Sequence, residues 1–406
     1  DLIKKNNLKM NILILGGGGR EHAFCWKLSK SKIVNDIFIA PGNAGTSELG
    51  VNLDISVNDF LAIKEEVIKN KIEMVLVGPE DPLVNGINDF FLSDKILNPI
   101  PVIGPTKEAA MLEGSKDFAK KFMERNSIPT AKYATFDKKT IKEGHEFLNT
   151  LNPPYVLKAD GLAAGKGVLI INDLAQAKTE LSEMLVGKKF GSASEKVIIE
   201  EFLKGIELSC FLITDGKSYL TLPLAKDYKR IGEGDTGLNT GGMGAVSPVP
   251  FADESFLNKI DENIIKPTIK GLAQEKINYV GFIFIGLIKV HNSPYVIEYN
   301  VRMGDPETQV VLPRIKNDFG EILSSITSKE ISKIKLEVDD KFATTIFAVS
   351  GGYPESYEKG KKIFNIDEIQ GSNVFHAGTV SKGSNIYTNG GRVLAITSLE
   401  ESFKEA

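Results

Sequence analysis

The chain has 406 residues, 42% of them hydrophobic, and is therefore long enough for two or three packed domains. Its formal net charge of -4 leaves no basic surplus, and no stretch is long and apolar enough to span a bilayer, so we expect a cytoplasmic protein that acts on small molecules without contacting nucleic acid or membrane. Cys25 and Cys210 stand apart from any Cys or His at metal-ligand spacing, which argues against a disulfide scaffold and a zinc site.

The first predicted unit begins at Met10 with the strand, turn and helix that open a doubly wound α/β sheet. The apolar run NILIL meets four glycines, and an amphipathic stretch follows them. Two further strands, from Asp36 to Ala40 and from Met74 to Val77, each end in a polar loop of the kind that binds ligands in open α/β sheets. We predict a Rossmann-like substrate domain over residues 10–113.

The four glycines do not fit a redox dinucleotide site. Counted from Gly16 and Gly18, the third glycine of that fingerprint would fall on Glu21, and no acidic residue ends the second strand. What remains is a helix amino terminus with exposed backbone amides and Arg20 beside it, which suits a phosphate monoester. The alternative is a tight turn that serves only close packing.

Beyond this unit, Ser115 is predicted to cap a helix that runs to about Asn126, and Pro129 closes it. A β-rich piece follows over residues 133–199. Within it, Lys158 lies on a predicted strand, and the loop after it carries Gly165, Lys166 and Gly167. Flexible backbone amides and two ammonium groups can close over a polyphosphate there, although a purely structural glycine loop has the same pattern.

The strand that starts at Val197 ends in residues whose backbone groups can face an adenine edge. These residues are Glu200, Glu201, Phe202 and Leu203. Glu207, a little further on, is placed to hold ribose hydroxyls. A plain edge strand with acidic residues facing solvent would look the same.

A further predicted strand, VIEYN at residues 296–300, places Glu298 and Asn300 on one face, and Arg302 follows at the same spacing. Carboxylate and amide oxygens suit Mg²⁺, which keeps waters and phosphate oxygens for its other positions. The forked guanidinium of Arg302 can clamp a carboxylate or a phosphoryl group in transfer. The alternative is a solvated polar face, but the turn that contains Asp305 favours a site.

Two predicted loops complete the set of candidates. AKDYKR contains Asp227 between basic residues and can hold a zwitterion, whereas DTGLNTGGMGA is rich in glycine and resembles a flap over a small substrate. Both can equally be surface loops. Short strands with glycine turns then predict a small β-rich domain over residues 336–406, in which SLEESFKEA begins a predicted closing helix, so the tail is truncated or this domain is smaller.

Taken in order, these segments resemble those of ATP-grasp enzymes, and more closely those of the phosphoribosylamine-glycine ligase family, also called glycinamide ribonucleotide synthetases. The resemblance runs from Met10 to near the end of the chain. The motifs that carry it are GGGGREHA, APGNAGT, VGPEDPLV, GPT, LEGSKDFAK, IPTA, KADGLAAGKGV, IEEFL, DTGLNTGGMGA, GDPETQ, GGYP, FHAGT and NGGRVL. Each is weak alone, but their joint order is highly specific.

The resemblance implies an ATP-grasp core over residues 114–335, with a small mobile lid over about 133–199 nested in it, and a monomeric enzyme. It implies that ATP, glycine and 5-phosphoribosylamine give glycinamide ribonucleotide, ADP and phosphate in purine biosynthesis, with glycyl phosphate as the intermediate. No enzyme nucleophile is then required, because catalysis comes from positioning and charge neutralisation.

The resemblance also implies residue roles. Lys116, Lys158 and the lid glycines would bind ATP phosphates, residues 200–203 adenine, and Glu298 and Asn300 a Mg²⁺ or Mn²⁺ ion. Phosphoribosylamine would contact Gly18, Arg20, Glu21 and Asn43. Glycine would lie near Asp227, Arg302 and Asp305, beneath a flap that includes Asn239, Gly241 and Gly242. Arg302, Lys158 and Asp305 are the expected catalytic residues.

Three positions depart from the family pattern. Met303 replaces a usual phenylalanine, Tyr228 a usual histidine and Leu238 a usual proline, which affects packing, glycine contacts and flap rigidity in that order. Two other functions remain open: another ATP-grasp ligase or carboxylase of purine metabolism, and a nucleotide-binding regulator without activity. The candidate metal ligands and Arg302 argue against the regulator.

Overall fold

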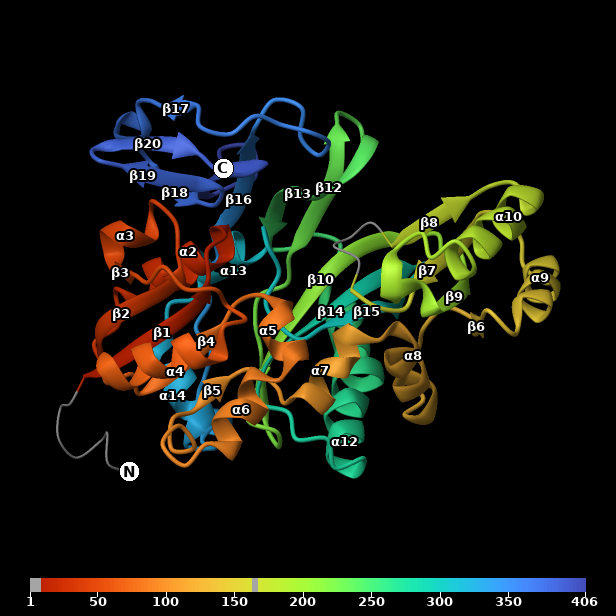
Figure 1. Cartoon of the computed structure of the whole chain (residues 1–406), viewed down its shortest axis with the longest axis horizontal. Coiled ribbons are helices and arrows are strands. Elements are labelled where there is room, and N and C mark those ends of the chain that lie inside the picture. Colours follow the sequence, from red (N-terminus) through yellow and green to blue (C-terminus); the bar gives the residue numbers. More distant parts are fainter. Residues whose placement is uncertain (1–8, 163–166) are drawn as a thin grey trace.

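The computed structural model describes residues 9–162 and 167–406 of the chain, and its first unit is a five-stranded parallel sheet in the order β3-β2-β1-β4-β5 (Figure 1). Its strands are β1 (Met10–Gly16), β2 (Val34–Pro41), β3 (Val51–Asn52), β4 (Met74–Val77) and β5 (Val102–Ile103). Residues 12–15 of β1 have no exposed surface, as expected for a parallel strand covered on both faces. The predicted Rossmann-like opening is confirmed.

Helices α2 (Gly19–Leu28), α3 (Thr46–Leu49), α4 (Phe60–Lys69), α5 (Glu80–Asn85), α6 (Ile87–Ser93) and α7 (Lys107–Gly114) connect and cover these strands. Helix α2 begins directly after the glycine run, and the run follows the end of β1. The carboxyl ends of β1, β2 and β4 therefore meet at one edge of the sheet, beside the amino terminus of α2.

Helix α8 (Lys116–Arg125) joins this unit to the next and has the predicted cap, because the Ser115 side chain accepts a hydrogen bond from the backbone of Phe118. An antiparallel sheet in the order β6-β9-β7-β8 follows, which we call the lid sheet. Its elements are β6 (Tyr133–Asp137), α9 (Ile141–Asn149), β7 (Tyr155–Ala159), β8 (Val168–Ile171), α10 (Leu174–Leu185), the 3-10 helix Gly191–Glu195 and β9 (Lys196–Glu201).

The lid sheet has a hydrophobic core of its own, in which α9 and α10 pack against Phe136, Leu157 and Val197. It lies at the end of the molecule opposite the N-terminal sheet (Figure 1). A separate core lets the lid sheet form a unit without the rest of the chain packing around it. Its mobility stays a prediction.

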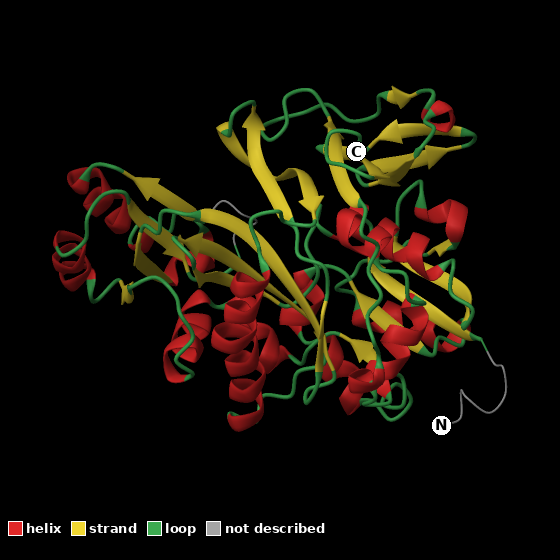
Figure 2. Ribbon diagram, turned by 180° about the vertical axis from the view of Figure 1, so that it is seen from behind, coloured by secondary structure: helices red, strands yellow, loops and turns green. Residues whose placement is uncertain are grey.

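The central sheet, in the order β11-β10-β14-β15, lies between these two units (Figure 2). It consists of β10 (Ile206–Thr214), β11 (Tyr219–Thr221), β14 (Gly281–Val290) and β15 (Ser293–Asn300). The helices that follow its strands or precede them are α11 (Glu254–Ile260), the π-helix Asp261–Ile265, α12 (Lys266–Gln274), α13 (Thr308–Arg314), α14 (Phe319–Thr327) and the 3-10 helix Ile331–Lys333. No helix in the described part of the chain has the length and apolar character to cross a membrane.

The C-terminal sheet, in the order β12-β13-β16-β21-β18, corrects two predictions. Its strands are β12 (Lys226–Gly232), β13 (Thr236–Ser247), β16 (Phe342–Val349), β18 (Ser372–His376) and β21 (Arg392–Glu400). The two segments predicted as loops are thus the hairpin β12–β13, and β13 pairs with β16 of the terminal region. The closing helix does not begin at Ser398 as predicted, because β21 runs to Glu400 and turns follow it up to Ala406.

A small sheet of β17 (Lys362–Ile363), β19 (Thr379–Lys382) and β20 (Asn385–Thr388), together with the 3-10 helix Ile366–Glu368, completes the terminal region. Since the C-terminal sheet takes two strands from residues 226–247, the division at residue 335 does not separate the sheets cleanly. The domain bounds 10–113, 114–335 and 336–406 stay a prediction.

Candidate active site

A cleft between the lid sheet and strand β15 brings together residues from distant parts of the chain. Helices α5, α7 and α8, strands β7 to β9 and the end of β15 all contribute to its walls. Seven of the predicted site residues line it: Lys116, Lys158, Gly167, Glu200, Glu298, Asn300 and Arg302. Gly165 and Lys166, which were predicted to close over phosphates, lie outside the described residues.

Glu298 and Asn300 present polar atoms to this cleft without partners from the protein. Among the described residues, the Glu298 carboxylate forms no hydrogen bond or ion pair, and the buried Nδ2 atom of Asn300 has no hydrogen-bond partner. Burial raises the pKa of Glu298, but the ammonium groups of Lys229, Lys158 and Lys116 outweigh it and bring the pKa below its ordinary value. The ionised carboxylate of Glu298 and the Oδ1 atom of Asn300, which accepts no hydrogen bond among the described residues, are oxygen ligands that suit a hard divalent cation, whereas Nδ2 can only donate a hydrogen bond.

Two lysines share one buried carboxylate in the wall of the cleft. Lys158 Nζ lies 3.0 Å from Glu200 Oε2, and Lys120 Nζ lies 3.2 Å from Glu200 Oε1. Lys120 also donates to Thr130 Oγ1 at 2.7 Å, and burial lowers its pKa to about 8. The Glu200 side chain is thus a counter-ion of lysines, while the adenine contact proposed for this stretch stays a prediction.

Arg302 is held in place by two carboxylates. Its Nε atom lies 3.1 Å from Glu80 Oε2, and its Nη2 atom lies 2.8 Å from Glu113 Oε1. The second oxygen of Glu113 accepts a hydrogen bond from Val301 N at 2.8 Å. Burial raises the pKa of Glu113 to about 7, although the guanidinium of Arg302 opposes this shift.

The sequence analysis missed Lys120, Glu80 and Glu113. A signal for Lys120 was present, because it lies one helical turn after Lys116 and therefore on the same face of α8. Glu80 follows a polar loop at the end of β4, where ligand sites of such sheets occur. For Glu113, at the end of α7, nothing local indicated a partner 189 residues away.

Several predicted nucleotide contacts lie outside the lining of the cleft. Glu201 accepts a hydrogen bond from Lys132 N at 2.8 Å, Phe202 is exposed, and Glu207 is exposed with its carboxylate 3.4 Å from Lys229 Nζ. Leu203 is half-buried beside them. Their roles at adenine and ribose stay predictions.

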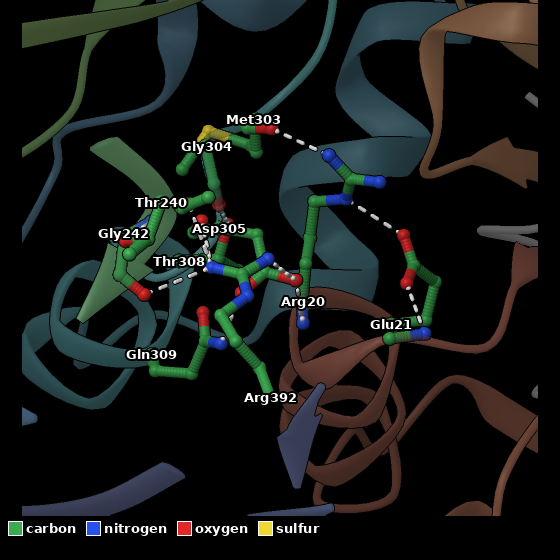
Figure 3. A network of polar contacts seen from close by, with 12 residues as sticks. Arg20, Glu21, Thr240, Gly242, Met303, Gly304, Asp305, Thr308, Gln309 and Arg392 are labelled. Atoms are coloured by element: carbon green, nitrogen blue, oxygen red, sulfur yellow. Dashed lines mark hydrogen bonds and ion pairs between the residues drawn. The ribbon is translucent and has the colours of Figure 1, made fainter. Parts of the chain in front are cut away.

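A second group of polar residues, which we call the Asp305 cluster, lies where α2 meets the chain after β15 (Figure 3). Arg20 donates from Nη1 to Met303 O at 3.1 Å, from Nε to Glu21 Oε1 at 2.6 Å, and from its backbone to Asp305 Oδ2 at 3.4 Å. Gly18 N donates to Glu21 Oε2 at 2.6 Å. A Cβ atom on Gly18 would lie 2.9 Å from Glu21 Oε2 and 3.1 Å from Asp305 Oδ2, so both carboxylates approach too closely for a side chain there.

Asn43 stabilises the loop after β2 with both ends of its amide. Nδ2 donates to His376 O at 2.8 Å, and Oδ1 accepts from Gly45 N at 2.9 Å and Thr46 N at 3.1 Å. The residue is 6% exposed. These contacts give it a role in loop shape, and the predicted contact with phosphoribosylamine stays a prediction.

The hairpin β12–β13 contains the predicted flap, and we call it the flap hairpin. Only part of it contacts the Asp305 cluster. Gly241 and Gly242 reach it through Arg392, which contacts their carbonyl oxygens as well as Asp305. Asn239 lies on an exposed part of β13 opposite Arg230, away from the cluster. Asp227, on β12, does not line the cleft and lies 3.7 Å from Lys229 Nζ. It is close to the turn that contains Asp305, because burial and, after it, the Asp227 charge raise the pKa of Glu307 to about 7.

The three departures from the family pattern lie in different surroundings. Met303 is buried in the hydrophobic core, where its flexible side chain fills space. Tyr228 and Leu238 lie on the flap hairpin with 46% and 51% of their surface exposed. Only the change at position 303 therefore affects packing in the interior.

The short segment of residues 300–305 connects the cleft with the Asp305 cluster. Asn300 and Arg302 line the cleft, whereas the Met303 carbonyl and Asp305 contact Arg20. A ligand in the cleft and a ligand at the Asp305 cluster would therefore lie on either side of residues 300–305. This arrangement suits a reaction in which a group activated at the first site is passed to a molecule held at the second.

Comparison with known proteins matches the chain to three family models. They are the N domain of phosphoribosylglycinamide synthetase over residues 10–113, its ATP-grasp (A) domain over 114–308 and its C domain over 343–406. The phosphoribosylamine--glycine ligase of Caldanaerobacter subterraneus subsp. tengcongensis is 45% identical over 397 residues, which cover 98% of this chain and 94% of the relative.

Among solved structures, the phosphoribosylamine--glycine ligase of Thermotoga maritima is 36% identical, with a TM-score of 0.83 and coverage of 98% of this chain and 94% of that one. The biotin carboxylase domain of 2-oxoglutarate carboxylase from Hydrogenobacter thermophilus has a TM-score of 0.71 at 15% identity, and the two chains are covered to 97% and 87%. The second likeness is one of fold alone.

Proposed function

The chain belongs to the phosphoribosylglycinamide synthetase family, and we propose that it uses ATP to join glycine to 5-phosphoribosylamine in purine biosynthesis, with release of ADP and phosphate. The observation that supports this reaction most directly is the position of residues 300–305 between the cleft and the Asp305 cluster. It allows glycine carboxylate to be phosphorylated on one side and the amine to attack from the other.

In the first step, glycine carboxylate attacks the γ-phosphorus of ATP to form glycyl phosphate. Lys116 and Lys158 place ammonium groups in the cleft, where they neutralise phosphate charge. Arg302, fixed by Glu80 and Glu113, adds a planar cation to clamp the phosphoryl group during transfer. Fixed cations need no reorganisation during the reaction, which is why such groups lower the barrier effectively.

Glu298 and Asn300 would hold a Mg²⁺ or Mn²⁺ ion through their side-chain oxygens, because both residues line the cleft and these oxygens have no partner among the described residues. When bound, the ion supplies further neutralisation of the phosphate oxygens. No group of three or more His, Cys, Asp or Glu residues forms a metal site in the described residues, which agrees with a site that relies on phosphate and water for its other ligands.

In the second step, the amine of phosphoribosylamine displaces phosphate from glycyl phosphate. Arg20 Nη2 has no hydrogen-bond partner among the described residues and would contact the phosphate monoester beside the amino terminus of α2, where the Gly18 and Arg20 amides already donate to Glu21 and Asp305. Asp305, held by Arg20 and Gln309, contributes a carboxylate near the glycine ammonium group. The lid excludes the water that would hydrolyse the acyl phosphate.

The test is the substrate dependence of ADP release by the whole chain. We expect release only when glycine and phosphoribosylamine are both present, with equimolar glycinamide ribonucleotide. Release driven by bicarbonate or formate would favour a related carboxylase or ligase instead. Tight ATP binding without turnover under any of these conditions would favour a regulator. Arg125→Ala, which removes a surface ion pair with Glu275 between residues that do not line the cleft, serves as the control variant.

We further propose, from its membership of this family, that the enzyme works as a monomer in the cytoplasm. Sedimentation at the concentration of the activity assay tests the oligomeric state. A dimer that dissociates with loss of activity would contradict the proposal.

A further inference from the structure

Arg392, in the NGGRVL motif at the start of β21, reaches from the C-terminal sheet into the Asp305 cluster (Figure 3). Its Nη1 atom donates to Asp305 O at 2.7 Å, to Gly241 O at 2.8 Å and to Gly242 O at 3.3 Å. Its Nη2 atom lies 3.5 Å from Asp305 Oδ2. One guanidinium thus joins the flap, the loop after β15 and the terminal region.

The guanidinium is itself fixed by packing. It lies over the Phe347 ring, 4.6 Å from the centroid, and the side chain is 19% exposed. Such stacking holds the planar group in one orientation, so its donors point at the same acceptors throughout. Lysine, with a single ammonium and no plane to stack, cannot reproduce this arrangement.

The flap peptide at Gly241 is held from both sides by the terminal region. Its N–H donates to Tyr353 Oη at 3.0 Å, and its carbonyl accepts from Arg392. The next residue, Gly242, has a φ of +116°, and a Cβ atom there would lie 2.4 Å from Pro306 Cδ. The flap therefore packs against the loop of Asp305 so closely that only glycine fits.

We propose that Arg392 is a positioning residue, which clamps Gly241 and Gly242 of the flap to the backbone of Asp305 and thereby closes the glycine side of the active site. Tyr353 assists by holding the other face of the same peptide. The GGYP and NGGRVL motifs of the terminal region then contribute to the reaction without lining the ATP cleft.

Charge at Asp305 supports this role. Burial raises the pKa of Asp305, but Arg392 and Arg20 outweigh it and bring the pKa below its ordinary value. The carboxylate therefore stays ionised beside the site where a glycine ammonium group would lie. Loss of Arg392 would remove the guanidinium charge beside Asp305 and also the donor to three carbonyl oxygens.

The claim that the clamp serves glycine rests on the proposed function, whereas the claim that Arg392 holds the flap does not. We would compare Arg392→Ala, Arg392→Lys and Tyr353→Phe with Lys382→Ala, which removes an exposed lysine of β19 in the same region. The measurements are KM for glycine, kcat, the Kd of a non-hydrolysable ATP analogue, and amide hydrogen exchange of residues 236–247 and 303–309.

We expect Arg392→Ala to reduce kcat/KM for glycine by roughly tenfold to a hundredfold, the loss that small misplacements of reacting groups produce. ATP analogue affinity should stay within about twofold, because Arg392 does not line the cleft. Arg392→Lys should restore little of the activity, and Tyr353→Phe should have a smaller effect in the same direction. Exchange should accelerate in the flap and the Asp305 loop only.

Two results would overturn the inference. Kinetics of Arg392→Ala equal to those of Lys382→Ala would show that the clamp is not needed. Equal losses of glycine and ATP affinity together with faster exchange throughout the chain would show a general stabilising role. If the wild-type chain fails to release ADP with glycine and phosphoribosylamine, the proposed function fails, whereas hydrogen exchange still decides whether Arg392 holds the flap.

Discussion

The cleft under the lid and the Asp305 cluster differ in how completely their charged groups are paired. In the cleft, the Glu298 carboxylate has no hydrogen-bond or ion-pair partner among the described residues, and Lys116 Nζ donates to the Gly161 carbonyl at 3.2 Å. In the cluster, Arg20, Glu21 and Asp305 bond to one another and to backbone groups. The cleft thus keeps the Glu298 carboxylate without a partner among the described residues, at a place where a ligand would bring positive charge, whereas the cluster pairs its carboxylates with Arg20 and with backbone groups.

Two cations of the cleft that are assigned to phosphate are paired: Arg302 bonds to Glu80 and Glu113, and Lys158 pairs with Glu200. We expect Arg302→Ala to reduce kcat by roughly a thousandfold or more, the lower range for arginines that neutralise charge in phosphoryl transfer. ADP release under saturating substrates measures it, with Arg125→Ala as the control. Near-normal turnover would remove Arg302 from the mechanism and assign it a structural role only.

A substitution at Glu298 tests whether its unpaired carboxylate binds a cation. Glu298→Gln keeps the shape of the side chain but removes its charge, and we expect turnover at limiting Mg²⁺ to fall roughly a hundredfold, as when one electrostatic contact to the reacting groups is lost. A titration of activity with Mg²⁺ should show partial recovery at high concentration. An unchanged Mg²⁺ dependence would show that the metal binds elsewhere.

A substitution at Glu113 tests how much the ion pair with Arg302 contributes to stability. Glu113→Ala removes a buried partner of the guanidinium and of Val301 N, so we expect the free energy of unfolding to fall by about 3 kcal/mol, as for other broken buried ion pairs. Urea denaturation measures this change. Glu80→Ala, which removes the more exposed partner, should cost less, and the reverse order would contradict the contacts described here.

The two histidines beside the Asp305 cluster add a dependence on pH. His376 N donates to His22 Nδ1 at 2.7 Å. Burial lowers the pKa of His22 to about 3 and that of His376 to about 4, from an ordinary value of 6.5. Between about pH 6.5 and 4 the unfolded chain thus binds protons that the folded chain does not, so stability falls as the pH falls.

Asparagine at position 22 keeps an acceptor near the place of Nδ1 but does not titrate. We expect His22→Asn to reduce the loss of unfolding free energy between pH 7 and pH 5 by about 1 to 2 kcal/mol, measured by urea denaturation at both pH values. Lys382→Ala should keep the wild-type slope. Equal slopes for His22→Asn and wild type would show that His22 is not a buried neutral group.

Sequence alone predicted the cleft better than the cluster. Glu298 and Asn300 are two residues apart on one strand, so strand geometry placed them together, and the Ser115 cap followed from local helix chemistry. The bond between Glu113 and Arg302 spans 189 residues, and those of Arg392 to Gly241 and Asp305 span 151 and 87. Such contacts depend on how sheets pack, which no local pattern encodes.

The same limit explains the flap. Its glycine-rich sequence favours a loop, yet β13 pairs with β12 between residues 236 and 246 and with β16 over residues 244–247, so strand pairing outweighs the weak intrinsic preference of glycine. The substrate contacts proposed for Asp227 and Asn239 depended on that loop. They need a ligand-bound structure to test them.

A crystal structure with Mg²⁺, a non-hydrolysable ATP analogue and glycine tests the central contrast most directly. We expect the triphosphate to lie against Lys116 and Lys158, a metal ion to contact Glu298 and Asn300, and the bonds of Arg20, Glu21 and Asp305 to stay as they are. A nucleotide bound outside the cleft, or an Asp305 cluster that rearranges to coordinate the phosphates, would contradict this account.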